Sequence, residues 1–177
     1  NGVHNVVRVS NGDLYVSDTR NNLIRKIDGK TNLVSTIAGV PGKKGSGGDD
    51  GPATKALLAD PISISLSPDE STLLIADIQN KRIRGIDLKS GIINTLAGNG
   101  RKGNPKEGEK ATEQPLADPR ASVMDVKGNL YVLERGGNAL RIVRSNGSIF
   151  TLAGTGKKGK QDGPAKQATF AGPKHLC

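Results

Sequence analysis

The chain has 177 residues, of which 24 are glycine and 2 % are aromatic, so its core must be built from Ile, Leu, Val and Ala between frequent turns. Lysine and arginine outnumber aspartate and glutamate by 9, a balance that favours anionic partners and says nothing about the fold. The single cysteine, Cys177, excludes an intrachain disulfide, and no apolar run approaches the ~18 residues of a membrane span.

The first part of the chain reads as four short strands separated by polar turns. Apolar residues alternate with polar ones or form short runs, which is the pattern of β-strands. A long connection rich in glycine, proline and charge follows, up to residue 61. The expected strands are NVVRV at 5–9, LYVSD at 14–18, LIRKI at 23–27 and LVSTIA at 33–38.

The next part repeats this order. ISISL at 62–66 alternates as a half-buried strand does, whereas LLIA at 73–76 is apolar throughout, which predicts a strand buried on both faces. IRGID at 83–87 and IINTLA at 92–97 complete the unit. After a second connection, a third unit at 120–154 reads ASVMDV, LYVLE, LRIV and SIFTLA.

Several landmarks recur at spacings of 56–59 residues, among them an Ala-Gly step that closes each unit. LADP at 58–61 recurs at 116–119 and is echoed by FAGP at 170–173. A four-stranded antiparallel meander repeated in tandem predicts an all-β fold of the β-propeller type. We expect a single partial propeller domain over 1–177, with blades at about 3–39, 62–98 and 120–154 and the start of a fourth at 172–177.

The hairpins LYVSDTRNNLIRKI, LLIADIQNKRIRGI and LYVLERGGNALRIV resemble the NHL repeat, a propeller blade named after its Asn-His-Leu tendency. The asparagine is present, as Asn21 or Asn22, Asn80 and Asn138, whereas the histidine is absent. The resemblance covers essentially the whole chain and implies a propeller fold. It does not single out a function, because such propellers include enzymes, RNA binders and protein-binding scaffolds.

Every unit has an acid at the end of its second strand and an arginine at the start of its third. These positions face each other across a hairpin, so we expect a structural acid–base pair whose truncation costs about 1–3 kcal/mol. A catalytic role is disfavoured because every blade carries the pair. The pairs are Asp18 with Arg25, Asp77 with Arg84, and Glu134 with Arg141.

Three blades are too few for a closed ring, since propellers typically have four to eight. Open blade edges are prone to aggregation. The sequence therefore predicts either a homodimer that completes a six-bladed ring or a fragment of a longer chain. Residues 1–10 do not resemble a signal peptide, so the compartment is unknown and export would need a signal ahead of this segment.

Two histidines are candidates for chemistry at the channel mouth. Counting from the blade acids and from Pro173 aligns both His4 and His175 with Ser63, at the start of an innermost strand. The resemblance implies that some NHL-like lyases hold Zn²⁺ through channel histidines, and imidazole suits that metal. Because Ser63 and Ala121 interrupt any ring of ligands, we predict no metal and no cofactor.

Acidic residues in the connections, Asp49, Asp50 and Asp162, lack the alternating spacing of a calcium loop. We interpret them as parts of turns that lead into a short helix begun by Pro52 or Pro164.

A pair of cations follows the fourth strand of every unit. Connections from outer to inner strands leave a blade at one face, so the pairs should share that face. Flanking glycines can present backbone N–H groups to an anion, and clustered cations would bind a polyanion with strong salt dependence. However, the basic segments contain no aromatic for base stacking. The pairs are Lys43 with Lys44, Arg101 with Lys102, and Lys157 with Lys158.

The sequence favours a non-catalytic NHL-type scaffold that binds a partner, protein or polyanion, through long basic loops on one face. One alternative is a propeller enzyme of the lyase or lactonase type with a metal in the channel. Such enzymes need channel carboxylates, and the expected first strands offer only Asp125, at a strand end. The other alternative is binding of RNA or another polyanion by the basic face.

Overall fold

The structure is a computed structural model that describes residues 3–176. Its strands form three antiparallel sheets in sequence order, and the described part contains no α-helix. The predicted fold class, an all-β propeller type with four-stranded antiparallel blades, is confirmed. The first blade consists of β1 (Val3–Arg8), β2 (Leu14–Asp18), β3 (Leu23–Ile27) and β4 (Val34–Ala38).

The second and third blades repeat this meander. In the second, a two-residue strand from the preceding connection, β5 (Gly51–Pro52), is added outside the fourth strand. Its other strands are β6 (Pro61–Leu66), β7 (Thr72–Asp77), β8 (Arg82–Asp87) and β9 (Ile92–Ala97). The third blade consists of β10 (Pro119–Met124), β11 (Leu130–Glu134), β12 (Ala139–Val143) and β13 (Ile149–Ala153).

Short 3-10 turns lie in the hairpins and connections. The turn at Ala53–Lys55 begins directly after Pro52, where the sequence predicted a short helix. Residues 172–176 contain no strand and Cys177 lies outside the described residues, so the start of a fourth blade stays a prediction. The other two turns are Thr19–Asn21 and Ala111–Glu113.

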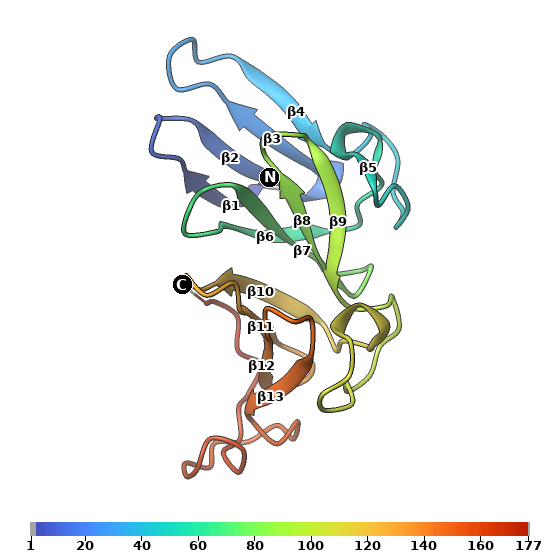
Figure 1. Cartoon of the computed structure of the whole chain (residues 1–177), viewed down its shortest axis with the longest axis vertical. Coiled ribbons are helices and arrows are strands. Elements are labelled where there is room, and N and C mark those ends of the chain that lie inside the picture. Colours follow the sequence, from blue (N-terminus) through green and yellow to red (C-terminus); the bar gives the residue numbers. More distant parts are fainter. Residues whose placement is uncertain (1–2, 177) are drawn as a thin grey trace.

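The blades lie one after another with their first strands together (Figure 1). β6 of the middle blade contacts β1 on one side and β10 on the other. Hydroxyl groups join neighbouring blades here: Ser17 Oγ of β2 donates to the carbonyl oxygen of Ile62 in β6 at 3.1 Å, and Ser65 Oγ of β6 donates to that of Ser122 in β10 at 2.7 Å. The first strands are therefore tied together, and the outer strands project away from them.

The core consists of two apolar layers, one at each junction between blades. β7 supplies both layers: Leu73 and Ile75 pack against the first blade, whereas Leu74 and Ala76 pack toward the third. All four side chains are fully buried, as the uninterrupted apolar run predicted. Burial of each large side chain stabilises the fold by about 1.5–3 kcal/mol, so the middle blade holds its neighbours in place.

Candidate functional site

Each of the first two connections crosses from the end of one blade to the outer edge of the next. The Asp50 N–H donates to the carbonyl oxygen of Ile93 at 3.0 Å, and the Ala53 N–H donates to that of Gly91 at 2.8 Å. The second connection does the same in the third blade, where the Ala111 N–H donates to the carbonyl oxygen of Gly147 at 2.9 Å. A blade is thus completed by the connection that precedes it.

All three connections begin with one backbone geometry. The N–H of the glycine in each Ala-Gly step donates to an alanine carbonyl further along its connection. At Gly98, φ is +92° and an added Cβ would overlap the carbonyl oxygen of Lys81, so only glycine fits. The recurrence of Ala-Gly therefore has a steric cause. The hydrogen bonds are Gly39 to Ala53 at 3.0 Å, Gly98 to Ala111 at 2.9 Å and Gly154 to Ala165 at 2.8 Å.

The LADP segment ends each connection in a left-handed residue before proline. Asp60, Asp118 and Gly172 have φ of +56°, +62° and +65°. Hairpin asparagines hold this turn: Asn22 Oδ1 accepts from the Asp60 N–H at 2.9 Å, and Asn138 Oδ1 accepts from the Gly172 N–H at 3.0 Å. In the first and third blades the asparagine of the NHL-like hairpin thus fixes the connection that leaves its own blade, whereas in the second blade Asn80 Nδ2 donates to the Gly45 carbonyl oxygen of the arriving connection at 2.6 Å.

The blade acids fix the connection that arrives. Asp77 Oδ1 accepts from the Ala59 N–H at 2.8 Å, and Glu134 Oε1 accepts from the Ala117 N–H. Both alanines belong to LADP segments, and both acids are fully buried. Sequence reasoning missed this role, although LADP recurs at the same spacing as the acids.

The arginine partners differ between blades. Glu134 Oε2 accepts from Arg141 Nε at 2.6 Å. The corresponding Asp77 Oδ2 lies 3.9 Å from Arg84 Nη1. No ion pair joins Asp18 to Arg25 among residues 3–176, and Asp18 accepts from the Asn21 side chain instead.

Asp49 is the principal anionic partner of Arg84. Its Oδ1 accepts from Arg84 Nη2 at 2.6 Å, and its Oδ2 accepts from Thr95 Oγ1 at 2.7 Å. In the third blade Glu107 replaces it, accepting from the Thr151 N–H at 2.9 Å. One feature of the sequence could have identified these two acids. Each lies four residues before the alanine, Ala53 or Ala111, whose carbonyl oxygen accepts the hydrogen bond from the glycine of the Ala-Gly step.

Burial controls the charge of Asp77. Burial away from water raises the pKa of this carboxyl to about 6. The hydrogen bonds from Asn80 and Ala59 and the nearby Arg84 charge favour the ionised form and lower the pKa, but burial has the larger effect. The opposite case is Asp13, whose pKa falls to about 2 because it accepts from Lys26 at 2.6 Å and from the Gly29 N–H. The two carboxyls therefore titrate on opposite sides of the usual aspartate pKa.

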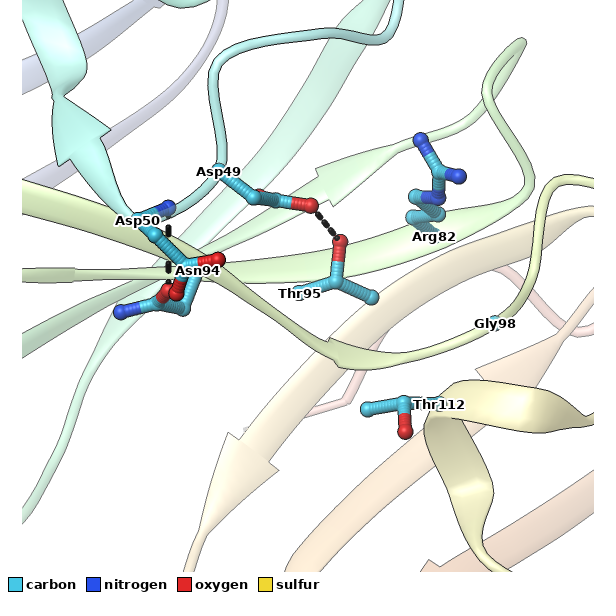
Figure 2. Close-up of a pocket in the computed structure, with 7 residues that line it drawn as sticks. All are labelled: Asp49, Asp50, Arg82, Asn94, Thr95, Gly98 and Thr112. Carbon is cyan, nitrogen blue, oxygen red and sulfur yellow. Dashed lines mark hydrogen bonds between the residues drawn. The ribbon is translucent and has the colours of Figure 1, made fainter.

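An open groove of about 270 Å³ lies beside the Asp49 anchor (Figure 2). Asp49 points toward Thr95, and the Asp50 backbone lies against the side chain of Asn94, whose Oδ1 accepts its N–H at 3.2 Å. The Asp49 carboxylate already has Arg84 and Thr95 as donors. The groove is therefore a seam where a connection is held against a blade. It is lined by Asp49, Asp50, Arg82, Asn94, Thr95, Gly98 and Thr112.

The six cations of the basic pairs are exposed, and none forms an ion pair within the described part of the chain. Lys44 Nζ does contact the side-chain oxygen of Gln79, in the hairpin between β7 and β8. In an antiparallel meander the fourth strand ends at the edge where the first begins, so topology assigns the connections to one edge of the blades. That the pairs bind anions stays a prediction.

The strand register shifts the expected channel alignment by one residue. Asn5 pairs with Ser17 as Ser63 pairs with Ala76, which makes Asn5 rather than His4 the equivalent of Ser63. The cause is that the first hairpin of the second blade is one residue longer. Asn5 Oδ1 accepts from the Ile64 N–H at 3.2 Å and so links adjacent first strands.

Both histidines are exposed: His4 lies in β1 at a register shift, and His175 lies beyond the last strand. Within residues 3–176, no three His, Cys, Asp or Glu side chains are grouped so as to hold a metal ion. No helix in the same range is long and apolar enough to cross a membrane.

Comparisons with known proteins bear on the family. No protein-family model matches the chain. The chain is 33 % identical to NHL repeat-containing protein 2 of Gallus gallus over 107 residues, which is 60 % of this chain and 14 % of that protein. It is 36 % identical to Protein SUPPRESSOR OF QUENCHING 1, chloroplastic, of Arabidopsis thaliana over 86 residues, 49 % of this chain and 8 % of that protein. The chain thus spans a small part of these relatives.

Solved structures support the fold. A protein of unknown function from Bacteroides thetaiotaomicron aligns with a TM-score of 0.74 and 22 % identity, over 97 % of this chain and 41 % of that one. Virginiamycin B lyase from Staphylococcus aureus aligns with a TM-score of 0.55 and 16 % identity, over 84 % of this chain and 40 % of the lyase. At these identities the likeness concerns the fold alone. The repeated blades and the relatives named for NHL repeats support a relationship to the NHL-type β-propellers.

Proposed function

We propose that the chain is a non-catalytic propeller scaffold that binds an acidic protein partner through the connections at one edge of its blades. The observation that carries this proposal is the contrast among its cations. Lys26, Arg84 and Arg141 have carboxylate partners within 2.6 Å, whereas the basic pairs of the connections are exposed and unpaired within residues 3–176. Charges that the fold does not neutralise are available to a partner.

The backbone that presents these charges is ordered in advance. The first connection is fastened by the Asp49–Arg84 pair and by β5, and the second by Glu107 and the Ala111 hydrogen bond. Because the backbone is already ordered, binding of a partner does not carry the entropic cost of ordering it. The lysine side chains are exposed, so an acidic surface could reach them.

A polyanion such as single-stranded RNA is the second candidate. The same exposed cations favour it, and its affinity would fall steeply with salt. However, Phe170 is the only aromatic residue in the three connections, and it is partly buried, so base stacking has little support. The exposed charge therefore favours an acidic protein surface over a nucleic acid.

Charge reversal on opposite edges tests the proposal. One variant carries Lys43→Glu, Lys102→Glu and Lys157→Glu, one change in each connection. The matched control carries Lys30→Glu, Lys89→Glu and Lys127→Glu, three exposed lysines in turns at the other edge of the blades. Both variants change the net charge equally.

The probes are a fluorescent glutamate-rich polypeptide and a fluorescent single-stranded RNA, measured by anisotropy at low and physiological salt. We expect the connection variant to bind the polypeptide at least ~10-fold more weakly than the control variant does. Equal binding by the two variants would show that only net charge matters and would refute the proposal. Strong binding of RNA but not of the polypeptide would favour the second candidate.

A further inference from the structure

A cavity of about 400 Å³ lies between the first and second blades. Its walls come from β2, β3 and β4 of the first blade, from β8 and the turn that follows it in the second blade, and from the first connection. Every wall is therefore built from parts of the chain that the structure describes. Among the lining residues are Tyr15, Lys26, Ile37, Ile86 and Leu88.

The corresponding cavity between the second and third blades is smaller and differently lined. Its volume is about 170 Å³, and no residue of the first connection lines it, although that connection covers the outer edge of β9. Strand register places Leu74 and Gly85 of the second blade where the first blade has Tyr15 and Lys26. The polar wall is thus a feature of the first junction and not of the repeat.

The Tyr15 hydroxyl opens onto the larger cavity without a protein partner. Tyr15 is only 7 % exposed, and its hydroxyl forms no hydrogen bond among residues 3–176. In that range Arg25 Nε is the one fully buried side-chain nitrogen or oxygen without a partner, so the Tyr15 hydroxyl must be reachable from the cavity. The equivalent hydroxyl of Tyr131 donates to Asp125 Oδ2 at 3.2 Å. Tyr15 therefore has a free donor where the third blade has a satisfied one.

The charges beside the cavity cancel. Lys26 Nζ lies 2.6 Å from Asp13 Oδ2, and the two side chains neutralise each other. Burial raises the pKa of Tyr15, so its hydroxyl stays protonated and neutral at physiological pH. The opposite wall is apolar, with Ile86 only 2 % exposed. Apolar walls with a few polar groups, in a volume of about 300–1,000 Å³, are typical of sites for small organic molecules.

We propose that this cavity binds a neutral organic molecule with an apolar body and an acceptor oxygen, such as that of a carbonyl group. The oxygen accepts a hydrogen bond from the Tyr15 hydroxyl, and the apolar body packs on Ile86 and Leu88. An anion is disfavoured because Asp13 already neutralises the ammonium group of Lys26. A wholly apolar molecule is disfavoured because it would leave the Tyr15 hydroxyl without an acceptor.

Three small probes test this chemistry on the wild-type protein. They are acetophenone, α-methylstyrene, in which a CH₂ group replaces the carbonyl oxygen, and benzoate, which is an anion. We expect acetophenone to produce saturable shifts in the amide resonances of Lys26 and Leu88, with at least ~5-fold tighter binding than either other probe. No saturable shift with acetophenone would overturn the proposal. Equal or tighter binding of α-methylstyrene or benzoate would overturn the proposed ligand class.

A matched pair of variants tests the role of the hydroxyl. Tyr15→Phe should weaken acetophenone binding about 5-fold, whereas Tyr131→Phe, at the equivalent place in the third blade, should leave it unchanged. Without a probe, Tyr15→Phe should unfold in urea at the same midpoint as wild type, because its hydroxyl has no protein partner within residues 3–176. Acetophenone bound equally well by Tyr15→Phe and wild type would contradict the assigned hydrogen bond.

Discussion

Arg84 and Arg141 stand at the same place in successive blades but take different carboxylates as their nearest partners. Arg84 binds Asp49 of the arriving connection, and Arg141 binds Glu134 of its own blade. In both blades the blade acid also accepts a backbone N–H from the connection. Arginine and acid together therefore join a connection to a blade, which is a wider role than the clamping of a hairpin.

Removal of Arg84 should destabilise the attachment of the first connection to the second blade. Arg84→Ala removes the cation that pairs with buried Asp77 and frees Asp49, so the free energy of unfolding should fall by about 3 kcal/mol. Arg82→Ala is the control, because among residues 3–176 this partly exposed side chain donates only to the Ser46 carbonyl oxygen, and its loss should cost at most ~1 kcal/mol. Urea unfolding monitored by circular dichroism measures both. Equal losses would contradict the account of Arg84.

Asp77 should give the protein an unusual dependence on pH. Its pKa in the folded chain, about 6, exceeds the ordinary value of 3.8. The folded state therefore binds a proton more readily than the unfolded state between pH 4 and pH 6, and Asp77 reduces stability as pH rises through this window.

Asp77→Asn should remove that contribution, so the stability of the variant relative to wild type should increase from pH 4 to pH 6. Asp50→Asn serves as the control for loss of an exposed carboxyl. Thermal unfolding at several pH values provides the measurement. A constant difference between wild type and Asp77→Asn over this window would show that the Asp77 pKa is not raised.

At the scale of elements, the repeated Ala-Gly step sets the start of each connection. Gly98→Ala places a Cβ against the Lys81 carbonyl oxygen, and we expect a loss of at least ~2 kcal/mol more than for Gly91→Ala. Gly91 has a comparable positive φ, +73°, but open space around it, so it isolates the steric clash from backbone strain. Urea unfolding of both variants checks the difference, and equal losses would remove the steric explanation.

The strands follow from local patterns, and for that reason the sequence predicts them well. LLIA at 73–76 shows burial on both faces directly, since each of its residues meets one of two neighbouring blades. The blade acids and arginines could be found because they recur. Their spatial partners could not be read off in the same way.

Asp49 illustrates a contact that local sequence patterns do not predict. It lies 35 residues before Arg84 in a segment of glycine and charge that resembles an ordinary turn. Its contact arises only because the connection folds back on the next blade, and that path depends on the tertiary structure. The alignment of His4 with Ser63 failed for a related reason: one extra residue in a hairpin moves the register without changing the strand pattern.

At the scale of the whole molecule, the connections have two tasks. Their anchored parts complete the next blade, and their basic segments face outward without carboxylate partners in the described structure. The first task accounts for the buried outer edges of the second and third blades. The second task is the basis of the proposed binding function.

Amide exchange at Val34 and Ile149 in dilute protein tests most directly whether a connection completes each blade. The Ile149 N–H donates to the Glu109 carbonyl oxygen of a connection at 2.9 Å, and Val34 occupies the same place in a strand that no connection covers among residues 3–176. We predict rapid exchange at Val34 and strong protection at Ile149. Equal protection of the two amides in monomeric protein would contradict the account.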